Sequence, residues 1–312
     1  MKLLFNSLRF RLTLLISLMI ILPMLITLSL VGFQGTSILQ KEATEKLSLQ
    51  ATALANNVNL WDKEHIRLMQ NLSIQPEIVS MKAKKQKPVL EKTARVYTNI
   101  YLFSTIGLNG LNVARSDNEK LKDYHDRPYF IEAVAGKDIV RQVLIGRTTG
   151  RPSVVFSSPI RNDQGTIIGV AMLSTDLAVV TERLKAVRLG QTGAAFVIDA
   201  QGKVLAHPEA KYAAELKDFR AHPTVGALLS GQPGAFTFTD NHNVTWLSHS
   251  MALENGWGII VQQQKQEIGE NVRFFWRFAT LVVLIVSSVV SLLTWIIATH
   301  LVRPLEKLTQ AA

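Results

Sequence analysis

The stretches LTLLISLMIILPMLITLSLVGF (residues 12–33) and FATLVVLIVSSVVSLLTWIIAT (residues 278–299) decide how this chain is organised. Each stretch is 22 residues long and contains no charged side chain. At about 1.5 Å of rise per residue, a helix of that length is about 33 Å long, which matches the ~30 Å hydrocarbon core of a bilayer. We therefore expect both stretches to be transmembrane helices.

Charges next to these stretches predict how the chain lies in the membrane. The flanking residues before the first stretch and after the second are basic: Lys2, Arg9, Arg11, His300, Arg303 and Lys307. Positive residues close to the end of a span tend to stay in the cytoplasm. We therefore expect cytoplasmic segments at residues 1–11 and 300–312 and an extracytoplasmic region at residues 34–272. We therefore also expect a multi-pass protein of the cell inner membrane with a periplasmic or extracellular domain.

Two alternatives compete with a pair of membrane spans. The first stretch could be a cleaved signal peptide, which also begins with positive charge. Its apolar run is longer than a typical h-region, however, and no small-x-small cleavage site follows it closely. The chain could also be a soluble protein with two buried core helices, but residues 12–40 contain no charge at all. We therefore favour an uncleaved signal anchor followed by a second span.

Composition narrows the chemistry of the region between the spans. The chain has no cysteine, so disulfides and thiol chemistry are excluded. Its net charge of +10 could indicate nucleic-acid binding. An extracytoplasmic domain does not meet nucleic acid, so we expect no nucleic-acid partner and interpret the charge as a bias toward anionic ligands or the membrane surface.

A long helix is predicted directly after the first span, over residues 36–82. Its apolar residues recur mostly at spacings of three and four, which is typical of one helical stripe. These are Ile38, Leu39, Leu47, Ala51, Leu54, Ala55, Val58, Trp61, Ile66, Met69 and Leu72. Unbroken, this helix would be about 70 Å long. It would serve as a stalk, as a coiled coil in a homodimer, or as both.

From Tyr97 the period of the apolar residues changes from about 3.6 to two, which predicts strands. The first set of strands is expected at residues 97–105, 111–116, 139–145, 153–160 and 166–174, with a helix at 127–136. After a helix at 177–189, a second set is expected at residues 194–199, 203–207, 235–239, 245–252 and 258–262, with a small helix at 222–230. The predicted fold class is therefore α+β, with two antiparallel sheets in series.

Several motifs resemble the double Cache (dCache) sensor domains of bacterial receptors. They are DRPYF at residues 126–130, TGRP at 149–152, SSPI at 157–160, GQTG at 190–193 and VID at 197–199. Each motif is weak alone, but their order between two spans is specific. The resemblance covers about residues 34–272 and implies two tandem PAS-like α/β modules, a distal one at about 83–176 and a proximal one at about 190–262.

The end of the chain resembles another signalling element. LVRPLEKL at residues 301–308 is similar to the opening of a HAMP helix, with its proline in the first helical turn, where the missing N–H is tolerated. The alternative is a generic amphipathic juxtamembrane helix. We expect residues 300–312 to begin a HAMP linker, and the chain to be a fragment of a longer protein.

The resemblance implies a ligand site in the distal module, between the motif helix and the sheet. The candidate ligand-binding residues are Arg127, Tyr129, Tyr124, Asp126, Arg147, Arg151 and Tyr101, with Arg115 as a further basic residue. An arginine can bind a carboxylate through two parallel hydrogen bonds. Structural alternatives stay open: Arg127 could pair with Asp126 or Asp123, and Arg147 and Arg151 could be solvated next to a turn.

The resemblance also implies what the ligand is not. Family members that bind amino acids carry a tryptophan–tyrosine pair after the arginine, and acidic residues that hold the ammonium group. Here the pair is Tyr129-Phe130, the first acidic position matches Gly146 with Leu144 as its companion, and the later one matches Ser174, two residues before Asp176. An unpaired ammonium group in a dry pocket is costly. We predict a small organic anion, such as a mono- or dicarboxylate, rather than an amino acid; amines, purines and other solutes remain alternatives.

Catalytic and metal-binding patterns are weak throughout. Asp199, His207 and Ser248 lack a nucleophile-elbow context, and His222, His242 and His249 lack a close metal-ligand spacing. We therefore expect no enzyme activity, metal or cofactor in this chain.

The expected function is a homodimeric transmembrane sensory receptor. It would pass a ligand signal through the second span and the HAMP linker to cytoplasmic signalling partners, as in chemotaxis. One alternative is the sensor part of a histidine kinase, or of a diguanylate cyclase or phosphodiesterase, whose catalytic domain lies beyond residue 312. Another is a stand-alone membrane binding protein.

Overall fold

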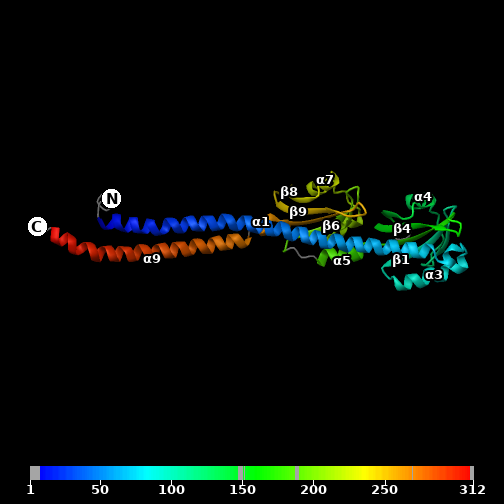
Figure 1. Ribbon diagram of the computed structural model, residues 1–312, viewed down its shortest axis with the longest axis horizontal. Coiled ribbons are helices and arrows are strands. Elements are labelled where there is room, and N and C mark those ends of the chain that lie inside the picture. Colours follow the sequence, from blue (N-terminus) through cyan, green and yellow to red (C-terminus); the bar gives the residue numbers. More distant parts are fainter. Residues whose placement is uncertain (1–7, 147–149, 151, 187–189, 269, 310–312) are drawn as a thin grey trace. The chain divides into compact units, whose positions relative to one another are not determined.

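The computed structural model describes residues 8–146, 150, 152–186, 190–268 and 270–309. They form two compact units (Figure 1). One unit holds the described residues up to 45 and from 264 onward, and the other holds residues 46–263. Each unit is described by itself.

The first unit is helical. It contains the first part of α1 (Leu8–Ser73), together with α8 (Lys265–Ile268) and α9 (Glu270–Thr309). Within the described residues, Trp276–Ile297 is the one helical segment long and apolar enough to cross a membrane, with a mean hydropathy of 2.5. Leu14–Leu30 is a shorter apolar segment. The composition of α9 thus fits the predicted second span, whereas the first span stays a prediction.

The second unit begins with the rest of α1, which ends earlier than predicted. From Leu47 onward the predicted apolar stripe is buried, except for the half-buried Ile66. The helix does not continue to residue 82, because Gln75 precedes a proline and adopts extended angles of φ −66° and ψ 136°. A residue before proline is sterically disfavoured in the helical region. Pro76 then starts a new short helix at its N1 position, where proline is tolerated.

Two helices that follow α1 were not predicted as separate elements. They are α2 (Pro76–Val79) and α3 (Ala83–Val96). α3 carries four lysines, one arginine and an internal proline, Pro88, and its buried residues are Gln86 and Leu90. Such a sequence lacks an apolar stripe that would indicate a helix. α3 ends at Val96 with Tyr97 as its C-cap, and residues 97–99 are not strand, contrary to the prediction.

The distal sheet follows α3 and is antiparallel throughout. Its strands are β1 (Ile100–Gly107), β2 (Asn112–Arg115), β3 (Val140–Ile145), β4 (Pro152–Arg161) and β5 (Ile167–Thr175), in the order β2-β1-β5-β4-β3. α4 (Pro128–Val134) packs on β3, β4 and β5. The side chains between α4 and the sheet form a hydrophobic core that includes Leu102, Tyr129 and Met172.

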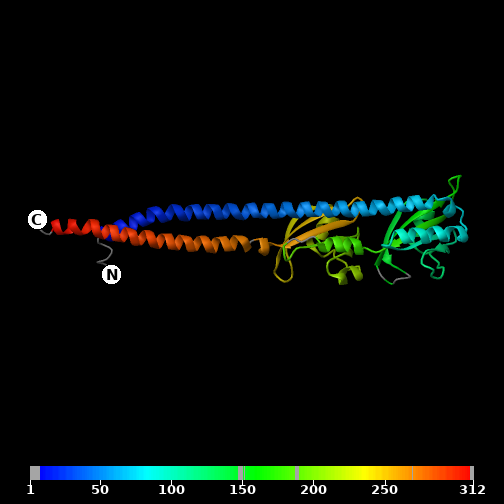
Figure 2. The same cartoon turned by 90° about the horizontal axis from the view of Figure 1, so that it is seen from below.

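The proximal sheet repeats this arrangement. After α5 (Ala178–Ala186) come β6 (Ala194–Ile198), β7 (Val204–Ala206), α6 (Ala210–Ala214), α7 (Pro223–Leu229), β8 (Gly234–Thr239), β9 (Thr245–Ala252) and β10 (Gly258–Gln264). The strand order β7-β6-β10-β9-β8 matches that of the distal sheet. Figure 2 shows the α1 segment of this unit running past both sheets. The predicted class, with two antiparallel sheets in series, is confirmed.

Candidate ligand pocket

A pocket lies between α4 and the distal sheet. Its lining comes from β1, β3, β4 and β5, from the residue after β3 and from the region of α4. The ten lining residues are Tyr101, Leu102, Tyr124, Arg127, Tyr129, Leu144, Gly146, Val155, Met172 and Ser174. The free volume of this cavity is about 20 Å³. That volume holds about one water molecule, so the pocket is nearly filled by its own side chains in this state.

The motif at residues 126–130 places two side chains at one end of this pocket. Arg127 is the N-cap of α4 with extended angles of φ −82° and ψ 128°, and Pro128 follows at N1. The Tyr129 N–H donates to Gln142 Oε1 at 3.3 Å, and Ser157 Oγ donates to the Tyr129 carbonyl at 2.8 Å. These bonds to β3 and β4 fix the start of α4 against the sheet, and Arg127 next to them lines the pocket.

Arg127 is half-buried, and its Nε is fully buried without a hydrogen-bond partner among the described residues. The structural alternative, an ion pair to Asp126 or Asp123, finds no support. Asp126 is exposed and does not line the pocket, and Asp123 contacts His125, with Oδ1 2.9 Å from Nδ1. A buried donor without an acceptor is costly. An anionic ligand would supply the missing acceptor.

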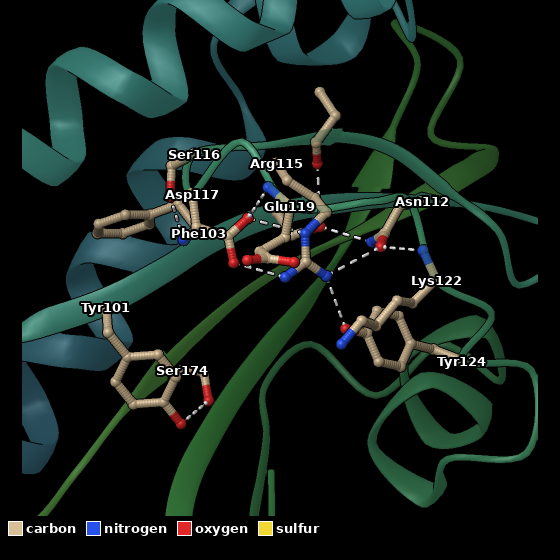
Figure 3. Close-up of polar contacts among 12 residues, drawn as sticks. Tyr101, Phe103, Asn112, Arg115, Ser116, Asp117, Glu119, Lys122, Tyr124 and Ser174 are labelled. Carbon is tan, nitrogen blue, oxygen red and sulfur yellow. Dashed lines mark hydrogen bonds and ion pairs between the residues drawn. The ribbon is translucent and has the colours of Figure 1, made fainter. Parts of the chain in front are cut away.

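Hydroxyl groups also line the pocket. The Tyr101 hydroxyl on β1 donates to Ser153 Oγ on β4 and lies 2.6 Å from Ser174 Oγ on β5. Figure 3 shows Tyr101 turned toward Ser174. These contacts join β1, β4 and β5 at the pocket wall.

A second arginine of the distal module, Arg115, has a structural role. It is 2% exposed, its Nε and Nη2 donate to the two Asp117 oxygens at 2.9 and 2.5 Å, and its Nη1 donates to the Tyr124 hydroxyl at 2.9 Å (Figure 3). Burial lowers the pKa of the Arg115 guanidinium, but its contacts with Asp117 and Tyr124 outweigh burial and raise that pKa overall. The charge of Arg115 is therefore balanced by Asp117, and Arg115 does not line the pocket.

The structure brings four of the seven candidate residues together: Tyr101, Tyr124, Arg127 and Tyr129. Arg147 and Arg151 lie outside the described residues. The positions assigned to missing acids, Gly146 and Ser174, also line the pocket. Leu102, Val155 and Met172 also line the pocket and were not predicted, although the alternation of side chains between the two faces of a strand could have indicated them. That these residues bind a ligand stays a prediction.

The described lining has one ionic side chain, Arg127, and no carboxylate. Aromatic and aliphatic side chains make up most of the remainder. Such a pocket suits a small molecule with one anionic group and an apolar body, because nothing in this lining would neutralise a ligand ammonium group.

The corresponding position of the proximal module, at the start of α7, is filled by packed aromatic side chains. α7 begins with His222-Pro223, as α4 begins with Arg127-Pro128. The His222 ring packs against Phe196 and Phe238, with centroid distances of 5.6 and 4.8 Å, and its Nε2 lies 3.1 Å from Gln262 Oε1. Burial lowers the pKa of His222, although the contact with Gln262 opposes this. A neutral histidine in an aromatic core takes the place of the pocket arginine.

Comparisons with known proteins place this architecture among sensor proteins. Protein IcfG of Synechocystis sp. is 24% identical over 313 residues, which cover 98% of this chain and 49% of that protein. Methyl-accepting chemotaxis protein PscA of Pseudomonas syringae is 24% identical over 179 residues, which cover 55% of this chain and 28% of that protein. The chain thus spans about half the length of the first relative, and the match to the second is shorter still.

A solved structure shares the fold. The ligand-binding domain of the Pseudomonas fluorescens chemoreceptor CtaA, in complex with L-isoleucine, superposes with a TM-score of 0.61 at 18% identity. The match covers 76% of this chain and 98% of that domain. The Cache domain family model matches residues 35–272, which is about three quarters of the sequence. The chain therefore belongs to the Cache domain family and carries a double Cache sensor of the bacterial receptor type.

Proposed function

We propose that this chain is the sensor part of a transmembrane receptor that binds a small organic anion in the distal pocket. The observation that carries the proposal is Arg127, whose buried Nε has no partner within the described residues and which lines a pocket without a described carboxylate. A ligand carboxylate would complete this arrangement with charge-assisted hydrogen bonds of about 1.5–3 kcal/mol each.

Amino acids are the competing ligand class, because CtaA was crystallised with L-isoleucine. An amino acid differs from its deamino carboxylate only in the ammonium group. Gly146 and Ser174 offer no negative charge to that group. The pocket chemistry thus favours the deamino compound of each pair.

The proposal is tested with matched ligand pairs. Titration calorimetry on residues 35–272 would compare propionate with L-alanine and 3-methylpentanoate with L-isoleucine, followed by a wider set of mono- and dicarboxylates. We expect at least one carboxylate to bind, and to bind about tenfold or more tightly than its α-amino partner, because burying an unpaired charge is unfavourable. Tighter binding of the amino acids would refute the organic-anion assignment.

We also propose the route of the signal. Residues 34–272 are extracytoplasmic, residues 12–33 and 278–299 span the membrane, and a homodimer passes the signal through the second span into a HAMP helix at residues 300–312. The name of PscA supports a chemotaxis-type output. Ligand binding would shift an equilibrium between two arrangements by its differential affinity for them. The role of this chain is binding and transmission.

The topology has a direct test. Alkaline phosphatase fused after Asp163, in the β4–β5 turn, should be active, because that enzyme folds only outside the cytoplasm. The same reporter fused after residue 312 should be inactive. A cytoplasmic location of Asp163 would contradict the proposed route altogether.

A further inference from the structure

One turn of α1 meets both modules of the second unit. The Trp61 ring lies 5.7 Å from Phe156 on β4 and 6.3 Å from Trp257 in the β9–β10 connection. The His65 ring stacks on Phe156 at 5.3 Å. Trp61 and His65 are each 5% exposed. This turn is therefore where α1 packs against the pocket sheet and the proximal module together.

A single carboxylate joins three segments at this place. Asp62 is 5% exposed, and its Oδ1 lies 2.8 Å from Arg141 Nε on β3. The same oxygen accepts a hydrogen bond from Asn255 Nδ2 at 3.4 Å. Asn255 in turn accepts the Trp257 N–H at 3.0 Å. Asp62, Arg141 and Asn255 form what we call the junction cluster.

Arg141 of the junction cluster lies on the face of β3 opposite to the ligand pocket, and Phe156 next to the cluster lies on the corresponding face of β4. Side chains alternate between the faces of a strand. On β3, Gln142 accepts the Tyr129 N–H and Leu144 lines the pocket, whereas Arg141 points to α1. On β4, Val155 lines the pocket and Phe156 contacts α1. A displacement of β3 at the pocket therefore displaces the Arg141 backbone as well.

The polar groups in and around the junction cluster are incompletely satisfied. Burial raises the pKa of the Asp62 carboxyl, and the Arg141 guanidinium lowers it by less. Arg141 Nε lies 2.8 Å from Asp62 Oδ1 but makes no well-aligned hydrogen bond with the described residues. Trp61 Nε1 and His65 Nε2 are also buried without hydrogen-bond partners among the described residues. A buried ion pair is by itself weak evidence for a stabilising role.

We propose that the junction cluster is the mechanical link through which β3 of the ligand pocket acts on α1 and on the proximal turn at Asn255. The link goes beyond the proposed ligand class, because it depends on the movement of β3 and not on the chemistry of the bound molecule. When the pocket opens or closes, Arg141 pulls on Asp62, and α1 follows.

Hydrogen exchange on the full chain in phospholipid nanodiscs tests the link without a ligand. Asp62→Ala should raise amide exchange about tenfold in two segments distant in sequence, residues 140–145 and 253–257, because both lose their shared partner. Asp62→Asn, which retains a hydrogen-bonding side chain, should give a smaller rise in the same segments and replaces the alanine variant if that variant does not fold. The matched control is Lys63→Ala. Lys63 is the next residue of α1 and forms an exposed ion pair of 2.8 Å with Glu254, which this substitution breaks. It should change exchange by less than about twofold.

A second arm separates coupling from a merely structural role. Leu144→Ala alters the pocket face of β3 only and should raise exchange about threefold at residues 58–66 of α1 when Asp62 is present. In the Asp62→Ala background, the Leu144 substitution should add nothing at residues 58–66, whereas the Lys63→Ala background should keep the full response. An equal response with and without Asp62, or changes confined to α1 in the Asp62 variants, would overturn the proposal.

Discussion

Replacing Arg127 with alanine should abolish carboxylate binding while leaving the fold of the distal module intact. Two charge-assisted hydrogen bonds at about 1.5–3 kcal/mol each correspond to a loss of about a hundredfold or more in affinity. The free energy of unfolding should change little. Arg127 Nε forms no hydrogen bond with the described residues, and the hydrogen bonds of the Tyr129 backbone fix the start of α4. Calorimetry with the best carboxylate of the matched panel measures the affinity, and urea unfolding of residues 35–272 measures the stability.

Two further variants sharpen this prediction. Arg127→Lys keeps the charge but loses the planar fork, so we expect about a tenfold loss rather than a complete one. Arg161→Ala is the control: this partly exposed arginine of the same module contacts Gly165 and Asp138 outside the pocket. It should bind the carboxylate as the unchanged chain does. Unchanged affinity in Arg127→Ala would remove Arg127 from the site.

Much of the fold could be predicted because it is encoded locally. Short apolar runs mark most of the strands, and hairpin neighbours such as β3–β4 and β8–β9 pair directly. The central pairs β1–β5 and β6–β10 instead join strands that are distant in the sequence. The end of α1 at Ser73 could also have been predicted, since Gln75 precedes a proline. α3 could not, because its burial depends on Gln86 and Leu90 alone, within a run of lysines.

The candidate site was harder to predict because its contacts are distant in the sequence. Tyr101 meets Ser153 and Ser174, 52 and 73 residues away, and no local pattern pairs them. Arg115 and Arg127 look alike in the sequence as basic residues of one module. Arg127 stands in the DRPYF motif, but it is the packing that gives the two their different roles, because Arg115 faces Asp117 and Tyr124 whereas Arg127 lines the pocket. The same chemical group is structural in one place and available to a ligand in the other.

That distinction predicts a second large effect, on stability instead of binding. Arg115→Ala should cost about 3–5 kcal/mol, because it leaves Asp117 charged and removes donors from Asn112 and the Tyr124 hydroxyl in a buried site. A domain has about 5–15 kcal/mol in total, so urea unfolding of residues 35–272 should show a large shift of the midpoint. Arg220→Ala is the matched control, since Arg220 pairs with Asp218 at 2.6 Å with the same two-residue spacing but in solvent. It should leave the midpoint nearly unchanged. If the two substitutions destabilise equally, burial does not set the role of Arg115, and its distinction from Arg127 fails.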